Sequence, residues 1–212
     1  MKDIYYMDLM DLMKEDSCPI CGLIEKKSLR QLDFLLYENV NDHGVRSDFL
    51  ASNGFCMHHA SMMQSLGDPL GHAILYEILL QKMLNELDNC TLNHFQDGCA
   101  LCDSERLIES NIMKSFMIMF KEDEFIQKYQ EKGLLCIYHL NKIRMNHYKD
   151  ASCNLSKLID ISLKKYKTLL SELSEIKRKS DYRFSDEMWT ENEKIAWKKV
   201  VQLTIDQGKH RR

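Results

Sequence analysis

Two short motifs, each present twice, decide how this chain folds. SCPICG occupies residues 17–22 and GFCMHH residues 54–59, whereas CALC occupies residues 99–102 and LCIYH residues 135–139. Each half of this stretch therefore contains C-x-x-C followed, after a spacer, by C-x-x-H. The second C-x-x-C lies 81 residues after the first, and the second C-x-x-H lies 80 residues after the first. A nearly fixed offset of this kind indicates an internal repeat.

Both motifs suit metal coordination. In C-x-x-C the chain turns so that both sulfurs point to one centre, and in C-x-x-H on a helix positions i and i+3 share a face. One pair of each completes a tetrahedral Cys₃His shell with no open position, and closed shells of this type are usually structural. We therefore predict one Cys₃His site in each repeat and two Zn²⁺ ions per chain. The first site would use Cys18, Cys21, Cys56 and His59, and the second Cys99, Cys102, Cys136 and His139.

Two other interpretations use the same residues. Three thiolates and an imidazole can also bind iron, so an iron–sulfur cluster is an alternative occupant. The Cys18-Pro19-Ile20-Cys21 motif could instead be a thiol redox pair that opens a helix. No βαβ pattern surrounds this motif and its second copy lacks the proline, which favours metal binding. The spacers of 34 and 33 residues are unlike a compact zinc finger and favour sites that join helices of a larger bundle.

The composition predicts an all-α fold. The 212 residues include only 2 Pro and 8 Gly, which favours long helices joined by few loops. Apolar periodicity predicts helices over about 3–14, 23–40, 56–66, 70–88, 103–120, 122–131 and 135–149, a long one from Asn154, and a last one from an N-cap at Ser185 to Gly208. We expect residues 1–150 to form a duplicated metal-binding helical domain, with repeat units at about 15–66 and 96–149. Residues 151–212 would be a C-terminal helical pair packed on it.

Charge and hydropathy indicate the expected location of the protein and the classes of partner that it could bind. No run of 18 apolar residues occurs, and the N-terminus lacks the apolar core of a signal peptide, so we expect a cytoplasmic protein without a membrane span. Residues 1–141 carry a net charge of −10 and residues 142–212 a net charge of +7. Acidic residues interrupt the basic C-terminal helices and no aromatic stacking platform accompanies them, which argues against nucleic-acid binding. The sequence leaves open whether a protein partner binds, and it does not indicate an oligomeric state.

Several other residues have ordinary explanations. His58 could replace His59 as a ligand, but Tyr138 stands at the matching position of the second repeat and favours His59. Cys90 and Cys153 fall outside the repeat and are expected to be small buried thiols. His72 is a lone histidine on a helix and is expected to be capped or exposed. The methionines at 113, 117 and 119 are expected to pack in the core, and no E-x-x-H pair indicates a di-iron centre.

The paired motifs, together with the closing segment Asp181-Tyr182-Arg183-Phe184…Glu193…Ala196-Trp197, resemble an uncharacterised family of bacterial and archaeal proteins that is labelled as a domain of unknown function. The resemblance covers nearly the whole chain and implies no activity. His58 and Tyr138 differ between the repeats, so the two sites need not be equivalent. The closed shells argue against an enzyme and favour a zinc-stabilised binding or adaptor protein. An iron–sulfur redox or sensor protein and a C-x-x-C thiol oxidoreductase stay as alternatives.

Overall fold

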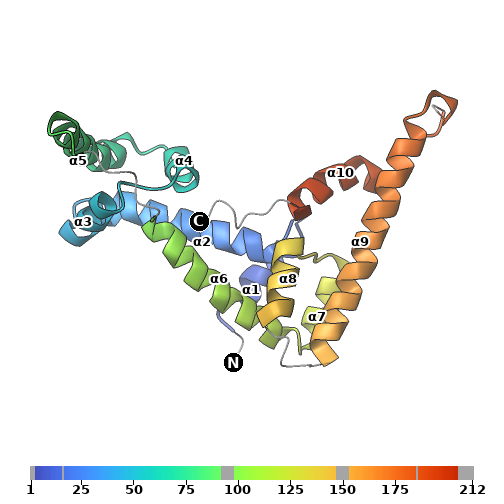
Figure 1. Cartoon of the computed structure of the whole chain (residues 1–212). Coiled ribbons are helices and arrows are strands. Elements are labelled where there is room, and N and C mark those ends of the chain that lie inside the picture. The colour runs from blue at the N-terminus through green and yellow to red at the C-terminus, as the bar shows by residue number, and fades with distance from the viewer. Residues whose placement is uncertain (1–2, 16, 92–97, 147–152, 185, 205–212) are drawn as a thin grey trace. The chain divides into compact units, whose positions relative to one another are not determined.

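The computed structural model describes residues 3–15, 17–91, 98–146, 153–184 and 186–204. This part of the chain contains helices and no strand, which confirms the all-α prediction. The helices are α1 (Tyr6–Leu12), α2 (Pro19–Phe34), α3 (His43–Ala51), α4 (Met57–Ser65), α5 (Pro69–Asp88), α6 (Ala100–Met119), α7 (Asp123–Glu131), α8 (Ile137–Asn146), α9 (Cys153–Lys179) and α10 (Glu191–Thr204), with a π-helical turn at Leu35–Asn39 and a 3₁₀ turn at Tyr182–Phe184 (Figure 1).

The chain forms two compact units. Unit 1 contains Met1–Leu23 and Ser110–Gln207, and unit 2 contains Ile24–Glu109. The division therefore falls inside α2 and α6: α2 begins in unit 1 and ends in unit 2, whereas α6 begins in unit 2 and ends in unit 1. These boundaries differ from the predicted division at residue 150, and α9 and α10 belong to the same unit as α7 and α8.

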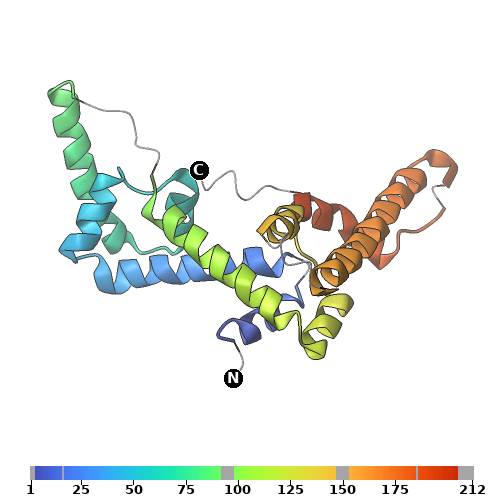
Figure 2. The same ribbon diagram turned by 60° about the horizontal axis from the view of Figure 1, so that its bottom comes forward.

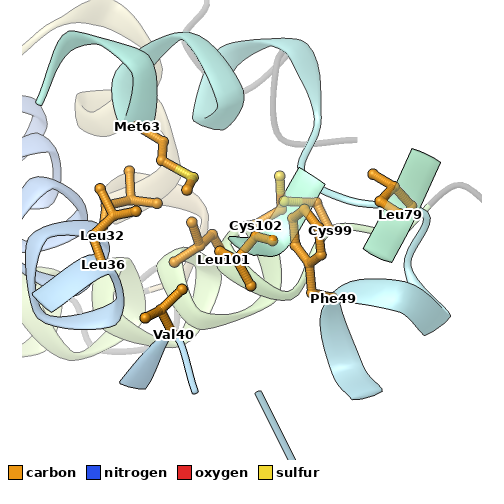
Figure 3. Close-up of a cluster of buried hydrophobic side chains, with 10 residues drawn as sticks. Leu32, Leu36, Val40, Phe49, Met63, Leu79, Cys99, Leu101 and Cys102 are labelled. Atoms are coloured by element: carbon orange, nitrogen blue, oxygen red, sulfur yellow. The ribbon is translucent and has the colours of Figure 1, made fainter. Parts of the chain in front are cut away.

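The helices of unit 2 pack around a buried apolar core. Its core includes Leu32 and Leu36 of α2 and the turn after it, Phe49 of α3, Met63 of α4 and Leu101 of α6 (Figure 3). Cys99 and Cys102 belong to the same buried cluster. The C-x-x-C motif of α6 is therefore surrounded by apolar side chains on the side that faces this core.

The part of α2 that lies in unit 2 runs opposite to the start of α6. Ser28 donates a hydrogen bond of 2.5 Å to Glu105, and Gln31, one turn later in α2, donates one of 3.0 Å to Ser104. Contacts that advance along one helix while they retreat along the other indicate an antiparallel pair. The start of α6 is thereby placed towards the end of α2.

Unit 1 has an aromatic core and a helical hairpin. Phe116 and Phe120 of α6 pack against Phe125 and Tyr129 of α7, with ring centroids 5.3 to 6.4 Å apart. The 27-residue helix α9 and the helix α10 form an antiparallel hairpin (Figure 1 and Figure 2). A buried ion pair of 2.9 Å between Lys179 and Glu193 joins the two helices near the turn.

Local signals account for the helix starts that differ from the prediction. Pro19 begins α2 and Ala100 begins α6, so the first cysteine of each C-x-x-C directly precedes a helix and the second lies in its first turn. The helix α3 was missed, although Asp42 caps it by accepting a hydrogen bond of 2.9 Å from the amide of Val45. The last helix begins at Glu191, and the predicted cap Ser185 lies outside the described residues.

Candidate metal centres

The eight predicted ligands gather into two groups of four. Site A consists of Cys18, Cys21, Cys136 and His139, and site B consists of Cys56, His59, Cys99 and Cys102. Within each group the candidate ligand atoms all lie within 4.8 Å of one another. Site A lies in unit 1 and site B in unit 2, so each compact unit contains one complete group.

The pairing of the motifs corrects the sequence-based expectation. We predicted that the C-x-x-C and the C-x-x-H of one repeat would share a site. The structure instead joins the first C-x-x-C to the second C-x-x-H in site A, and the second C-x-x-C to the first C-x-x-H in site B. The residue set of the predicted sites is unchanged, but each site takes one pair from each repeat.

The helices between the motifs explain this exchange. Each C-x-x-C opens a long helix, and a helix rises by about 1.5 Å per residue, so the 16 residues of α2 span about 24 Å. The helix α2 carries the chain from unit 1 into unit 2, where Cys56 and His59 follow, and α6 carries it back into unit 1, where Cys136 and His139 follow. The partner of each C-x-x-H is therefore the C-x-x-C of the antiparallel helix.

Site A is assembled from the N-terminal turns of two helices. Cys18 directly precedes α2 and Cys21 lies in its first turn, whereas Cys136 directly precedes α8 and His139 lies in its first turn. The Nδ1 atom of His139 is 3.1 Å from the sulfur of Cys136, 3.2 Å from that of Cys21 and 3.6 Å from that of Cys18. The sulfurs of Cys21 and Cys136 are 3.7 Å apart. All four residues are buried.

Site B repeats this arrangement with α6 and α4. Cys99 directly precedes α6, and Cys56 is the N-cap residue of α4. The Nδ1 atom of His59 is 3.3 Å from the sulfur of Cys56 and 3.5 Å from those of Cys99 and Cys102. The sulfurs of Cys56 and Cys102 are 3.7 Å apart. Three of these residues are buried, whereas Cys56 is partly exposed.

These distances fit one tetrahedral ion in each site. With bonds of about 2.3 Å to sulfur and about 2.0 Å to nitrogen, ligand sulfurs on one ion lie about 3.8 Å apart, and sulfur lies about 3.5 Å from nitrogen. The separations are 3.7 Å for one pair of sulfurs in each group and 3.1 to 3.6 Å between sulfur and Nδ1. The Cys₃His donor set is also one that zinc prefers in structural sites. The residues present therefore fit a single Zn²⁺ in each group.

The electrostatics of each group call for a cation. In site B, burial opposes ionisation of Cys99, but hydrogen bonds with His59, Cys56 and Cys102 and the charge of His59 together outweigh it and lower the pKa of Cys99 to about 6. Burial and the negative charge of Cys99 then raise the pKa of Cys102. In site A, hydrogen bonds from Cys136 and Cys21 outweigh burial and lower the pKa of Cys18, whereas the pKa of Cys21 is raised by its bonds to Cys136 and Cys18. A bound divalent cation would allow all three thiols to ionise.

A buried carboxylate orients the histidine of site B. The Nε2 atom of His59 lies 3.0 Å from a carboxylate oxygen of Glu105, and both side chains are almost completely buried. That oxygen also accepts the hydrogen bond from Ser28. Burial lowers the pKa of His59, but hydrogen bonds to Cys99 and Glu105 raise it to about 10. A carboxylate on the far nitrogen fixes the ring so that Nδ1 faces the three sulfurs.

Sequence reasoning missed Glu105, although a signal was present. Glu105 follows Cys102 by three residues on α6, so the two side chains share a helix face. An acidic residue on the face that carries a metal ligand is a candidate for holding a ligating histidine.

The loop that precedes Cys136 of site A contacts α7 and α9. Tyr129 of α7 and Ser162 of α9 share a hydrogen bond of 2.7 Å, and the amide of Leu135 donates to the Tyr129 oxygen at 3.3 Å. Tyr166 of α9 donates a hydrogen bond of 2.7 Å to the carbonyl of Leu135. Lys165 donates to the carbonyls of Tyr129 and Gly133, at 2.6 and 2.7 Å. The loop that leads into Cys136 is therefore held by α7 and α9.

Three other histidines and cysteines that the structure describes, His58, His72 and Cys90, belong to neither group of four. His58 is exposed, although it lies close enough to His59 and Glu105 to form a third group of possible ligands. The Nδ1 atom of His72 donates a hydrogen bond to the carbonyl of Asp68. Cys90 is exposed, which corrects the expectation of a buried thiol: it lies two residues beyond the end of α5, with a φ of +52°. The side chain of Cys153 lies outside the described residues. The three methionines at 113, 117 and 119 are buried in the core, as expected.

Comparison with known proteins confirms the resemblance seen in the motifs. The sequence matches a family described as a family of unknown function, DUF6062, over residues 1–96 and again over residues 89–210. These two matches are consistent with the internal repeat. The chain is also similar to an uncharacterised 23.9 kDa protein in the xynA 3′ region of Caldicellulosiruptor sp. (strain Rt8B.4), with 31% identity over 202 residues that span 92% of this chain and 98% of that protein. No solved structure matches the chain.

Proposed function

We propose that this chain, which belongs to the DUF6062 family of unknown function, is a helical binding or adaptor protein stabilised by two zinc ions. Each ion would be held by a closed Cys₃His shell, and each shell would join the N-terminal turns of two helices that are distant in the sequence. The sites would be structural, because four protein ligands leave no position for a substrate or a water.

One observation carries this proposal. Each compact unit contains four candidate ligands whose atoms lie within 4.8 Å of one another, and seven of the eight residues are buried. Clustered buried thiolates without a cation would place like charges together in an apolar environment, which is costly. A cation at the centre of each group removes that cost and adds binding energy to the folded state.

The spacing favours a single ion over an iron–sulfur cluster. The thiolates of a cubane cluster bind different irons, so their sulfurs lie farther apart than two ligands of one ion. The separations of 3.7 Å between sulfurs in both groups are those of one ion. The thiol oxidoreductase is also disfavoured, because Cys18 and Cys21 are only 3% and 7% exposed and a redox pair has to reach its substrate.

Exposed apolar surface supports the binding role. The helix α5 packs on the core of unit 2 through Leu75 and Leu79, yet it also leaves Leu70, Leu80, Leu84 and Leu87 between 47% and 70% exposed. A helix that is apolar on both faces is usually covered on both. No helix in the described part of the chain is long and apolar enough to cross a membrane. These leucines are therefore consistent with a protein that works through association.

Metal analysis of protein purified without oxygen tests the proposal. We expect two zinc ions per chain and no visible absorption. Brown protein that contains iron and acid-labile sulfide would instead establish the cluster alternative. Metal-free protein with a Cys18–Cys21 disulfide that cycles on reduction would favour the oxidoreductase.

A further inference from the structure

The two sites differ at one matched position. Cys56 and Cys136 are the first residues of the two C-x-x-H motifs, 80 positions apart, and each directly precedes a helix. Their sulfurs have similar distances to the neighbouring histidine, 3.3 Å for Cys56 and 3.1 Å for Cys136. However, Cys136 is 1% exposed, whereas Cys56 is the ligand of either site that is not buried.

The elements around each site account for this difference. The residue before Cys136, Leu135, is completely buried and has both its amide and its carbonyl bonded to tyrosines of α7 and α9. The residue before Cys56, Phe55, is only partly buried. The helix α9 also belongs to unit 1, so its hydrogen bond to the residue before Cys136 lies within the unit that contains site A.

We propose that Cys56 is a modification site: peroxides and thiol-directed electrophiles attack it first and thereby release the ion of site B, while site A keeps its ion. This rests on the proposed function, because it requires that both sites hold zinc. Ligation keeps the thiols as thiolates, and the thiolate is the nucleophilic form of cysteine. Access then decides which of the six thiolates reacts, and Cys56 is the accessible one.

With hydrogen peroxide the chemistry has two steps. The Cys56 thiolate attacks one peroxide oxygen, the O–O bond breaks, and a sulfenic acid and a hydroxide ion form. The thiolate of Cys102 then attacks the Cys56 sulfur, so that a disulfide forms and a second hydroxide leaves. The two sulfurs give up two electrons and the peroxide accepts them.

The geometry favours Cys102 as the second thiol. Its sulfur is already 3.7 Å from that of Cys56, and disulfide formation needs an approach of about 1.7 Å more. The disulfide removes two of the four ligands, so only Cys99 and His59 would remain. Two ligands bind zinc much more weakly than four, and the ion is released. A thiol reductant restores both thiolates and the site.

The test uses the full chain with Cys90→Ser, which removes an exposed thiol that belongs to neither site. Zinc is counted first by elemental analysis. Hydrogen peroxide or N-ethylmaleimide is then added, released zinc is followed with a chromogenic chelator, and modified cysteines are identified by peptide mapping over time. We expect one ion to leave at least about tenfold faster than the other, together with modification of Cys56. Peroxide should yield a Cys56–Cys102 disulfide.

Two matched variants show which site releases its ion in the fast phase and which site releases it in the slow phase. Cys136→Ala should keep only the ion of site B and lose it in the fast phase, and Cys56→Ala should keep only the ion of site A and lose it slowly. If either variant does not fold, peptide mapping of the parent chain still decides. Equal release of both ions, or modification of Cys18, Cys21 or Cys136 before Cys56, would overturn the inference. A chain that contains no zinc would refute the proposed function instead, and the order of alkylation would still test the accessibility of Cys56.

Discussion

The carboxylate of Glu105 would influence a metal ion in site B only indirectly, through His59. Its carboxylate lies 3.0 Å from His59 and receives the hydroxyl of Ser28, and it is 1% exposed. Removal of its charge should leave the histidine less firmly oriented. Such partners typically change metal affinity about 10- to 100-fold.

We therefore predict that Glu105→Gln weakens one zinc site by about 10- to 100-fold and leaves the other unchanged. Competition with a chromophoric chelator measures both affinities. Glu77→Gln on the exposed face of α5 is the matched control and should change neither affinity. Two unchanged sites in Glu105→Gln would show that the carboxylate does not support His59.

The sequence was sufficient to name the eight residues that gather into the two groups, because the residue types and the spacing of C-x-x-C and C-x-x-H are those of metal ligands. The register of the repeat was also sufficient to favour His59 over His58 as the candidate ligand. The exposure of Cys56 and of Cys90 could not be predicted. It depends on which later helices cover each position, and the local sequence does not encode that.

Gly54 lies in the turn that leads into Cys56 and the helix α4. It adopts a φ of +88°, and a Cβ at this residue would lie 2.9 Å from the Cδ2 atom of Leu79. Gly67 also has a positive φ, of +72°, but nothing lies within 4 Å of its Cβ position. Both substitutions to alanine strain the backbone, but only the one at Gly54 also displaces a buried leucine.

We predict that Gly67→Ala costs about 1 kcal/mol of unfolding free energy, and that Gly54→Ala costs about 1 kcal/mol more than that. Urea denaturation of the zinc-loaded proteins measures both. Equal costs would mean that the Leu79 side chain moves aside without loss.

The capping box of α10 gives the protein a pH dependence. Thr190 and Glu193 exchange hydrogen bonds, with the Thr190 amide donating at 2.8 Å and the Glu193 amide donating at 3.2 Å. Hydrogen bonds from Lys179 and then from Thr190 lower the pKa of Glu193 below its ordinary value of 4.5. A carboxyl group of this kind stabilises the fold fully above pH 4.5, and this contribution is lost as the pH falls through the lowered pKa.

Glu193→Gln should therefore destabilise the protein above pH 4.5, and its difference from the parent chain should shrink below that pH. Acid also releases zinc from thiolates, so the comparison is between variants at each pH rather than along the pH series. Glu191→Gln, in the same helical turn but 88% exposed on its side chain, is the control. A difference that does not depend on pH would contradict the role of the carboxylate.

At this scale the helices themselves were largely predictable, because their apolar periodicity is strong. The pairing of the motifs was not. It depends on the antiparallel contact of α2 with α6, through Ser28 and Glu105 and through Gln31 and Ser104. These polar residues give no periodic signal. The repeat alone suggests that the C-x-x-C and the C-x-x-H of one copy form one site. Because α2 and α6 are long and antiparallel, each C-x-x-C instead meets the C-x-x-H of the other copy.

The whole molecule consists of two units that each contain one site, so zinc should stabilise both. Removal of zinc should lower the unfolding free energy by several kcal/mol, because ligand binding that is linked to folding is lost. Thermal unfolding followed by circular dichroism, with and without a strong chelator, measures the change. A chelator preloaded with zinc is the control. An unchanged midpoint after complete zinc removal would mean that the sites are not structural.

The exchange of pairs between repeats is tested most directly by counting zinc in two double variants. Cys21→Ala with Cys136→Ala removes two ligands of site A only, and it should leave one zinc ion per chain. Cys21→Ala with Cys56→Ala removes one ligand from each site, and it should leave none. Pairing within each repeat predicts the opposite counts, no zinc in the first variant and one in the second, and that result would contradict the exchanged sites.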